Sequence, residues 1–431
     1  MESFEYKGYW YLPDNIDRRI AGILTFNDGE SASLELIGEI ELYENPIYSI
    51  AGPEIYDVIW GVNDKAKKIT LLNCNLTSRH MNFNCDFPIK KFSVQYIIVG
   101  QHIKFPEESL FDMCRVEIPT LTKWCFPAVI QQSIKYQDRC QKIESIGLSI
   151  NSSKLDQAIS SVSIEELGIK VSLYPQVNIS WDIYAPETKQ LTTLVIENNS
   201  KDTIWSFIHN VYIFEQFISF VTLSNIKVDK FTLQDKDSCQ VLQNGQKLYD
   251  SVLLYYIRHD VDSQYCKERL LFNYDSIKDK FPEIIARWYL QSDDIAPIRT
   301  HLIQSIQPKK LFTSIDFLIV FQAIEGYMIR FKYGDKSVKQ NLKKLIEEYN
   351  DIRNLNCDKI DIDAIVDSRN YYSHFMSKSK KPKTLDGYAL FCQTSKLKDL
   401  LICCMLSFVG FTHDEINNLM AKSEYSFFTP Q

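Results

Sequence analysis

The sequence predicts an α+β protein in which a β-rich N-terminal domain, residues 1–275, precedes an all-α helical bundle, residues 276–431. The chain has 431 residues, more than one hydrophobic core usually holds. Apolar residues alternate with polar ones up to Asp275 and then recur at helical spacing. The charge changes as well: the N-terminal part carries 26 Lys and Arg against 36 Asp and Glu, and the C-terminal part carries 22 against 19. A mildly basic C-terminal part permits a phosphate-binding surface there.

The N-terminal domain opens with a predicted β-hairpin. Residues 20–26 and 33–38 each alternate in polarity, and Asn-Asp-Gly-Glu at 27–30 links them. These turn residues tolerate the positive φ angles of a tight turn. One helix, residues 203–223, interrupts the strands and is expected to lie across the sheet. Further strands are predicted at 69–74, 93–99, 170–173, 177–179 and 192–198. Three tryptophans are expected in the sheet core: Trp10, Trp60 and Trp124.

Beyond residue 275 the apolar spacing is helical. Residues 313–332 are apolar on most sides, so this segment is expected at the centre of an antiparallel bundle of four to six helices. Gly334 and Asp335 are expected to end it, and residues 350–361 are predicted to form a polar loop. The other helices are predicted at 281–291, 296–307, 338–349, 362–376 and 385–408.

The sequence lacks the signals of several protein classes. The N-terminus is acidic and has no long apolar run, so no secretory signal is expected. No stretch of about 18 apolar residues free of charge suggests a membrane helix. Eleven cysteines are scattered without the two close pairs of ligands that a zinc ribbon needs. We therefore expect a cytoplasmic protein with free thiols, no membrane association, and neither a metal nor another cofactor.

One segment of the helical region carries the residues for a reaction: Arg369-Asn370-Tyr371-Tyr372-Ser373-His374. Histidine passes protons near neutral pH, and the planar fork of arginine suits a phosphate. In a helix, Asn370 lies four residues before His374, so its amide can orient the imidazole. Such a set suits RNA cleavage, in which the 2′-hydroxyl attacks the adjacent phosphorus and no metal is required. Because one histidine cannot easily be base and acid at once, two copies facing each other in a homodimer are expected.

The same residues also permit a purely structural interpretation. His374 can be an ordinary helix-end histidine favoured by the helix dipole, with Arg369 paired to Asp363 or Asp367. Tyr371 can stack on a base, or it can pack in the core or at an interface. Glu325 lies in an otherwise apolar helix, where it either holds Arg369 or belongs to an exposed stripe.

A lysine-rich segment follows the motif. Four lysines are candidates for gripping RNA phosphates beside the site: Lys378, Lys380, Lys381 and Lys383. The alternative is an ordinary solvated loop, the usual role of a charge run.

The helical bundle with Arg-Asn-x-x-x-His late in the domain resembles the HEPN superfamily, whose nucleases carry Arg, four to six residues, then His. The N-terminal domain adds a second resemblance, to the N-terminal domain of ApeA-type anti-phage HEPN proteins. It rests on residues 8–13 (Gly-Tyr-Trp-Tyr-Leu-Pro), 21–24, 34–38 and 69–74. Together the two resemblances cover most of the chain.

The resemblance implies a metal-independent endoribonuclease of a bacterial anti-phage system of the abortive-infection type. Its composite site would lie in a homodimer or higher homo-oligomer, with Arg369 binding the phosphate and His374 transferring protons. Asn370 would orient His374 or the scissile phosphate. The N-terminal domain would sense or regulate, and a phage-derived trigger is a possible partner besides RNA.

Two other functions stay open at this point. A non-catalytic HEPN-like module would bind RNA, a nucleotide or a partner protein through the same groove. A solely structural interaction protein would do neither. Double substitution of Arg369 and His374 separates them, since only an enzyme loses RNA cleavage while RNA binding persists.

Overall fold

The computed structural model describes residues 1–41, 54–80, 88–137, 142–180, 184, 187–241, 247–256, 270–306, 311–335 and 337–422. The chain divides into two compact units. The first contains the strands, and the second contains the helices from residue 270 onward together with residues 123–126 and 212–226. The two units therefore interleave along the sequence, and the boundary at residue 275 stays a prediction. None of the described helices combines the length and apolar character that a membrane crossing requires.

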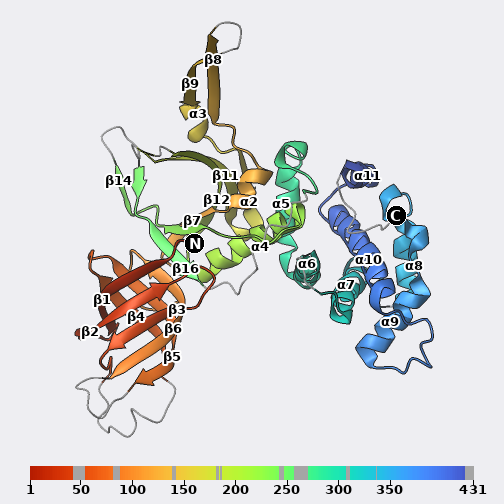
Figure 1. The fold of residues 1–431 in the computed structure, drawn as a ribbon, viewed down its shortest axis with the longest axis horizontal. Helices are drawn as coiled ribbons and strands as arrows, with labels where there is room; N and C mark the ends of the chain where they lie inside the picture. The colour runs from red at the N-terminus through yellow and green to blue at the C-terminus, as the bar shows by residue number, and fades with distance from the viewer. Residues whose placement is uncertain are drawn as a thin grey trace. The chain divides into compact units, whose positions relative to one another are not determined.

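The first unit is built on one antiparallel sheet of twelve strands, of which six close into a ring (Figure 1). The ring runs in the order β6-β3-β2-β1-β4-β5 and closes because β5 also pairs with β6. The ring strands are β1 (Phe4–Leu12), β2 (Asn15–Phe26), β3 (Ala32–Ile37), β4 (Ile55–Asn63), β5 (Lys68–His80) and β6 (Ile89–Val99). The hairpin predicted around the turn at 27–30 is β2 and β3, with Leu24 opposite Leu34.

The remaining strands extend the sheet from β6 in the order β16-β13-β7-β12-β11-β10. They are β7 (Phe111–Glu117), β10 (Ser160–Ile164), β11 (Ile169–Ser180), β12 (Glu187–Asp202), β13 (Lys230–Gln234) and β16 (Val252–Tyr256). The strands predicted at 170–173 and 177–179 are one strand, β11, because Pro175 does not interrupt it. On one side β10 pairs only as far as Leu173, so Pro175 lies where that side of β11 needs no N–H donor.

Two small sheets stand apart from the twelve strands. The first pairs β8 (Ile130–Gln137) with β9 (Lys142–Ile150), and the second pairs β14 (Cys239–Val241) with β15 (Lys247–Tyr249). Among the residues that the structure describes, three α-helices accompany the strands in the sequence: α2 (Pro119–Trp124), α3 (Ser152–Leu155) and α4 (Ile204–Thr222). The helix predicted at 203–223 is α4, and from Tyr212 onward it belongs to the helical unit.

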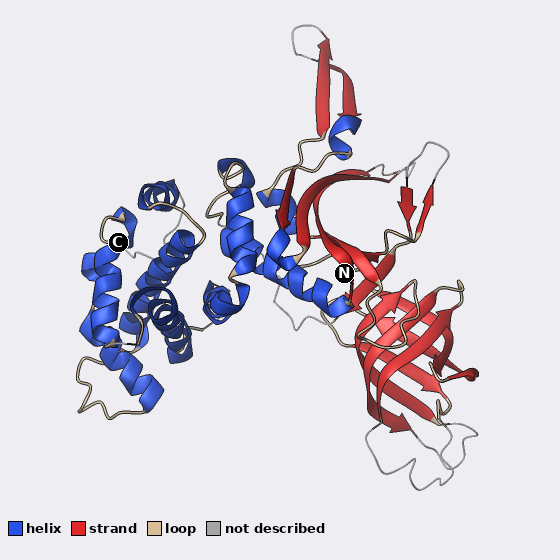
Figure 2. Cartoon of the chain, turned by 180° about the vertical axis from the view of Figure 1, so that it is seen from behind, coloured by secondary structure: helices blue, strands red, loops and turns tan. Residues whose placement is uncertain are grey.

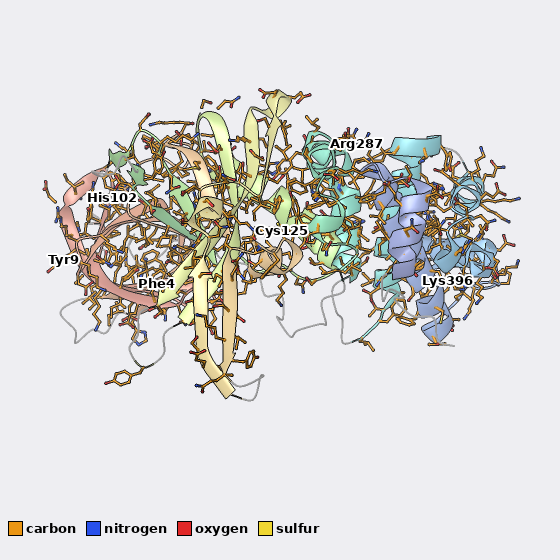
Figure 3. The ribbon with its side chains drawn as sticks, turned by 90° about the horizontal axis from the view of Figure 1, so that it is seen from above. Phe4, Tyr9, His102, Cys125, Arg287 and Lys396 are labelled. Atoms are coloured by element: carbon orange, nitrogen blue, oxygen red, sulfur yellow. The ribbon has the colours of Figure 1, made fainter. Side chains whose placement is uncertain are left out.

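The three tryptophans expected in the sheet core have different environments. Trp10 is fully buried in the apolar cluster inside the closed ring. Trp60 is half-buried outside that cluster, where its ring stacks on that of His102 with centroids 4.7 Å apart. His102 is labelled in Figure 3. Trp124 is buried among helices, with its ring 5.6 Å from that of Phe217. The prediction is therefore correct for Trp10 and wrong for the other two. Trp124 packs with helices, and Trp60, on β4, lies outside the core cluster with its Nε1–H donating to the Ile103 carbonyl oxygen at 2.8 Å.

The second unit is a helical bundle (Figure 2). Its helices are α5 (Phe281–Leu290), α6 (Ser292–Ile306), α7 (Ser314–Tyr327), α8 (Val338–Glu348), α9 (Ile362–His374), α10 (Gly387–Phe408) and α11 (His413–Lys422). The predicted central helix is α7, which contacts α6, α9 and α10. It continues as a π-helical segment, Met328–Tyr333, and Gly334 follows with a φ of 70°. An α+β fold, with strands first and a helical region last, is thus confirmed, and α11 is a helix that the sequence did not predict.

Candidate active site

Helix α9 carries the Arg-Asn-x-x-x-His segment to its C-terminal end. The helix begins where the Asp361 carboxylate accepts a hydrogen bond from the Ala364 backbone N–H at 3.0 Å. It ends after His374, because Phe375 adopts a left-handed conformation with a φ of 51°. His374 is therefore the last helical residue, and its side chain is exposed.

Arg369 holds the segment together. Its Nη2 donates to both carboxylate oxygens of Glu325 on α7, at 3.0 and 3.3 Å. Its Nη1 lies 3.1 Å from Oδ1 of Asn370 and 2.6 Å from Nε2 of His374. The side chains of Arg369 and Glu325 are 22% and 17% exposed, so the ion pair is largely shielded from water. A charge-assisted pair in that environment is stronger than one at the surface.

The contact between Arg369 and His374 fixes the form of the imidazole. A guanidinium has five N–H donors and no acceptor, so Nε2 of His374 must accept this hydrogen bond. An imidazole nitrogen accepts only when it is unprotonated, which places the ring proton on Nδ1. The nitrogen that can take up a proton therefore faces the guanidinium that can bind a phosphate.

Comparisons with known proteins match each half of the chain to a protein family. Residues 5–288 match the family described as ApeA N-terminal domain 1, and residues 318–415 match the Apea-like HEPN family. The chain belongs to the ApeA-type HEPN proteins. The first match alone covers more than half of the chain, and the second contains Glu325, Arg369, Asn370 and His374. Searches of the curated proteins and of the solved structures found no significant match. These matches support a HEPN-type defence protein.

Within the HEPN bundle, Glu325 takes the first of the two roles that the sequence left open. It pairs with Arg369 from the facing helix rather than lying in an exposed stripe. Asn370 differs from expectation, because its amide oxygen accepts from Arg369 instead of contacting His374 directly. Nη1 of Arg369 contacts both the Asn370 amide oxygen and Nε2 of His374. Asn370 therefore orients His374 only through Arg369.

The alternative partners of Arg369 are occupied elsewhere. Lys383 Nζ donates to Asp363 at 2.6 Å, and Lys339 pairs with the same carboxylate. These two lysines hold the pKa of Asp363 at about 2, below its ordinary value. Asp367 pairs with Lys381 at 3.4 Å. The structural interpretation in which Arg369 pairs with either aspartate is therefore wrong.

The lysine-rich loop after α9 is tied to nearby carboxylates. Lys381 and Lys383 form the pairs just described, and Lys378 pairs with Asp386 at 2.9 Å. Lys380 is exposed on the same loop. To grip RNA, three of the four lysines would first have to exchange a carboxylate for a phosphate. Their RNA contact stays a prediction.

The two tyrosines of the motif belong to the packing of the bundle. The Tyr372 hydroxyl donates to the Leu385 carbonyl oxygen at 3.0 Å, and its ring lies edge-on to that of Phe317. Tyr371 is half-buried with its ring edge-on to Tyr372 at 4.9 Å. This geometry favours the packing role over base stacking for both rings.

Sequence reasoning missed Ser368, which fixes the loop behind the site. This fully buried residue donates to the Ala364 carbonyl oxygen at 2.7 Å and accepts from the Leu385 N–H at 2.9 Å. The signal was a serine inside an amphipathic helix, where such a residue often bonds the backbone four residues earlier.

In the described residues, no three His, Cys, Asp or Glu side chains gather closely enough to hold a metal ion.

Proposed function

We propose that this protein is a metal-independent endoribonuclease that acts in the cytoplasm as a homodimer in bacterial anti-phage defence of the abortive-infection type. The observation that carries the proposal is the chain of contacts from Glu325 through Arg369 to His374. It presents a fixed guanidinium and an unprotonated imidazole nitrogen side by side. Those are the two groups that cleavage of RNA by its own 2′-hydroxyl requires.

The reaction starts with the scissile phosphate on Arg369. Nη1 exchanges its bond to His374 for a phosphate oxygen, and Nη2 stays on Glu325. This exchange frees Nε2 of His374, which accepts the proton of the 2′-hydroxyl as its oxygen attacks phosphorus. Arg369 stabilises the charge on the equatorial oxygens. The bond from phosphorus to the 5′-oxygen breaks, and the products are a 2′,3′-cyclic phosphate and a 5′-hydroxyl end.

The departing 5′-oxygen needs a proton from a second group. In a homodimer the second copy of His374, protonated once it has released its bond to Arg369, supplies it across a shared cleft. The residues that follow His374 support a contact between copies, because Phe375 is 89% and Met376 40% exposed. Exposed apolar side chains beside an exposed catalytic group are typical of surfaces that another chain covers.

The N-terminal unit is proposed to sense infection and hold the nuclease silent until then, with a phage-derived molecule as the trigger. This part of the proposal rests on the match to the ApeA N-terminal domain. A host cell tolerates a nuclease that cuts its own RNA only if that nuclease is inactive before infection.

The test is cleavage of total cellular RNA by the purified full-length protein in EDTA, followed by end-group analysis. We expect 2′,3′-cyclic phosphate ends from the wild type. Arg369→Lys should lose most activity despite keeping its charge, because an ammonium lacks the two-pronged geometry of guanidinium. Strict dependence on magnesium with 5′-phosphate products would contradict the mechanism. Light scattering that finds a fully active monomer would contradict the shared cleft.

A second candidate function is a HEPN module that binds RNA, a nucleotide or a partner protein without cutting it. The loop lysines Lys378, Lys381 and Lys383 and Arg369 are paired with carboxylates, so within this candidate the binding of a partner protein is favoured over that of RNA or a nucleotide. Double substitution of Arg369 and His374 discriminates between the two. An RNase loses cleavage and keeps measurable RNA binding, whereas the wild type of a pure binding module shows no cleavage to lose.

A further inference from the structure

The β8–β9 hairpin has one apolar and one polar face. Side chains alternate between the two faces of a strand, so residues that pair across the hairpin share a face. The cross-strand pairs on one face are Ile130–Ile150, Gln132–Leu148, Ile134–Ile146 and Tyr136–Ile143. The pairs on the opposite face are Gln131–Ser149, Ser133–Gly147, Lys135–Ser145 and Gln137–Lys142. We call the first set the apolar face.

A bulge preserves this arrangement. Lys135 pairs with Ser145, and the next residue, Tyr136, pairs with Ile143, so Glu144 is the extra residue. Without the bulge, Ile143 would lie on the face opposite to Ile146, because their spacing is odd. The irregularity thus keeps Ile143 on the same face as Tyr136 and extends the apolar face toward the far end of the hairpin.

The apolar face is open to solvent. The exposed fractions are 46% for Ile134, 49% for Tyr136, 57% for Ile143, 55% for Leu148 and 36% for Ile150. In the part of the chain that the structure describes, β8 and β9 pair only with each other, and Figure 1 shows them projecting as a separate ribbon. An isolated two-stranded hairpin is marginally stable in water, and further strands or a packed face are needed to stabilise it.

We propose that the apolar face is a self-association surface that packs against the same face of a second copy of this chain. Among the described residues of the hairpin, the apolar face carries no charged side chain, and its polar groups are the Gln132 amide and the Tyr136 hydroxyl. In a two-fold contact the same patch lies on both sides of the interface, so a face with charges of one sign would repel itself and an uncharged apolar face does not. Packing two such ribbons face to face gives a four-stranded sandwich.

The area is sufficient for a specific contact. Five side chains of which about half is exposed present on the order of 500 Å² per hairpin, and two copies together bury about 1,000 Å². That is the lower limit for a contact between proteins and suits a weak, reversible association. The contact involves the N-terminal unit and not α9, so it does not rest on RNA cleavage. With a second two-fold contact between HEPN bundles, it would build assemblies larger than a dimer.

The first test measures the mass of the full-length chain by sedimentation over a range of concentrations. The variant Ile134→Lys/Leu148→Lys places two charges on the apolar face. The control, Ser133→Lys/Ser149→Lys, places two charges on the opposite face of the same strands. We expect the first variant to weaken association at least tenfold and the control to keep the wild-type mass. Circular dichroism must show both variants folded, and RNA cleavage by the same samples reports separately on the α9 site.

The second test detects the contact directly. Gln132→Cys lies on the apolar face and Ser133→Cys on the opposite one, and neither replaces an apolar core residue. Under mild oxidation we expect Gln132→Cys to give a covalent dimer on a denaturing gel and Ser133→Cys to give only the wild-type background. The proposal would be overturned if Ile134→Lys/Leu148→Lys keeps the wild-type mass and both cysteine variants cross-link equally. The apolar face would then bind a different protein or peptide.

Discussion

The ion pair between Glu325 and Arg369 offers the sharpest test of the proposed site. Glu325→Gln keeps the shape of the side chain and one carbonyl acceptor but removes its charge. Of the two contacts of Arg369 Nη2, at 3.0 and 3.3 Å, one then becomes a neutral hydrogen bond to the amide oxygen and the other is lost, because the amide nitrogen is a donor. A hydrogen bond to a charged group contributes about 1.5–3 kcal/mol and a neutral one about 0.5–1.5 kcal/mol. We therefore expect the variant to lose about 1 kcal/mol of stability, or about 2–4 °C in Tm.

The effect on cleavage should exceed the effect on stability. Arg369 would still contact Asn370 and His374 but would no longer be held from the α7 side. When Nη1 then moves to the phosphate, the guanidinium has lost its charged anchor. We expect a rate about 10- to 100-fold lower, since each factor of ten corresponds to about 1.4 kcal/mol in the barrier.

The matched control is Glu347→Gln in the same bundle. Glu347 pairs with Lys343 at 3.8 Å, and the two side chains are 64% and 69% exposed. A pair this exposed contributes at most about 0.5 kcal/mol, so stability and cleavage should stay near the wild-type values. In an Arg369→Ala background the Glu325→Gln change should have no further effect on cleavage. If Glu325→Gln cleaves RNA within about twofold of the wild type, the anchoring role of Glu325 is wrong.

Two further predictions concern folding stability. His374→Ala should abolish cleavage but lower stability by no more than about 0.5 kcal/mol, because the His374 side chain is exposed. Phe321→Ala should lower stability by about 3–5 kcal/mol, because Phe321 is fully buried on α7. Equal shifts of the two variants in thermal melts would contradict the site assignment. Burial raises the pKa of the Asp399 carboxyl, on α10, to about 7. The native state therefore binds the carboxyl proton more tightly than the unfolded chain does, and the free energy of unfolding falls as pH rises from about 4 to 7. Asp399→Asn should therefore be more stable than the wild type at pH ~8, by up to about 4 kcal/mol, and not at pH ~4; urea unfolding that shows no pH dependence in the difference would refute this.

Local pattern identified seven of the ten described α-helices but only six of the sixteen described strands. The alternation on either side of the Asn-Asp-Gly turn predicted β2 and β3, and the apolar spacing of residues 313–332 predicted α7. Both signals are local, because the spacing of apolar residues within one strand or helix depends only on that segment of the sequence. Helix α11 carries such a signal as well and was missed: Thr412 and Glu415 form a capping box, and Ile416, Leu419 and Met420 follow at helical spacing.

Long-range pairing was not available from the same patterns. Nothing in the sequence says that β5 also pairs with β6 and closes the ring, or that Trp124 packs with Phe217 rather than in a sheet. Such partners are chosen by the packing of whole elements, and one aromatic residue is compatible with many of them. The split of β11 into two predicted strands has the same origin, because Pro175 is tolerated only at an unpaired edge.

The candidate site divides in the same way. The sequence by itself determined which residues are near each other along α9, so Arg369, Asn370 and His374 could be named from their spacing. Only the tertiary structure decided that Glu325, on another helix, holds Arg369, that Asp363 and Asp367 pair with lysines instead, and that Asn370 contacts the arginine. The physical reason is that helical spacing fixes neighbours within about one turn, whereas the partner of a long charged side chain depends on which helices pack together and at what angle.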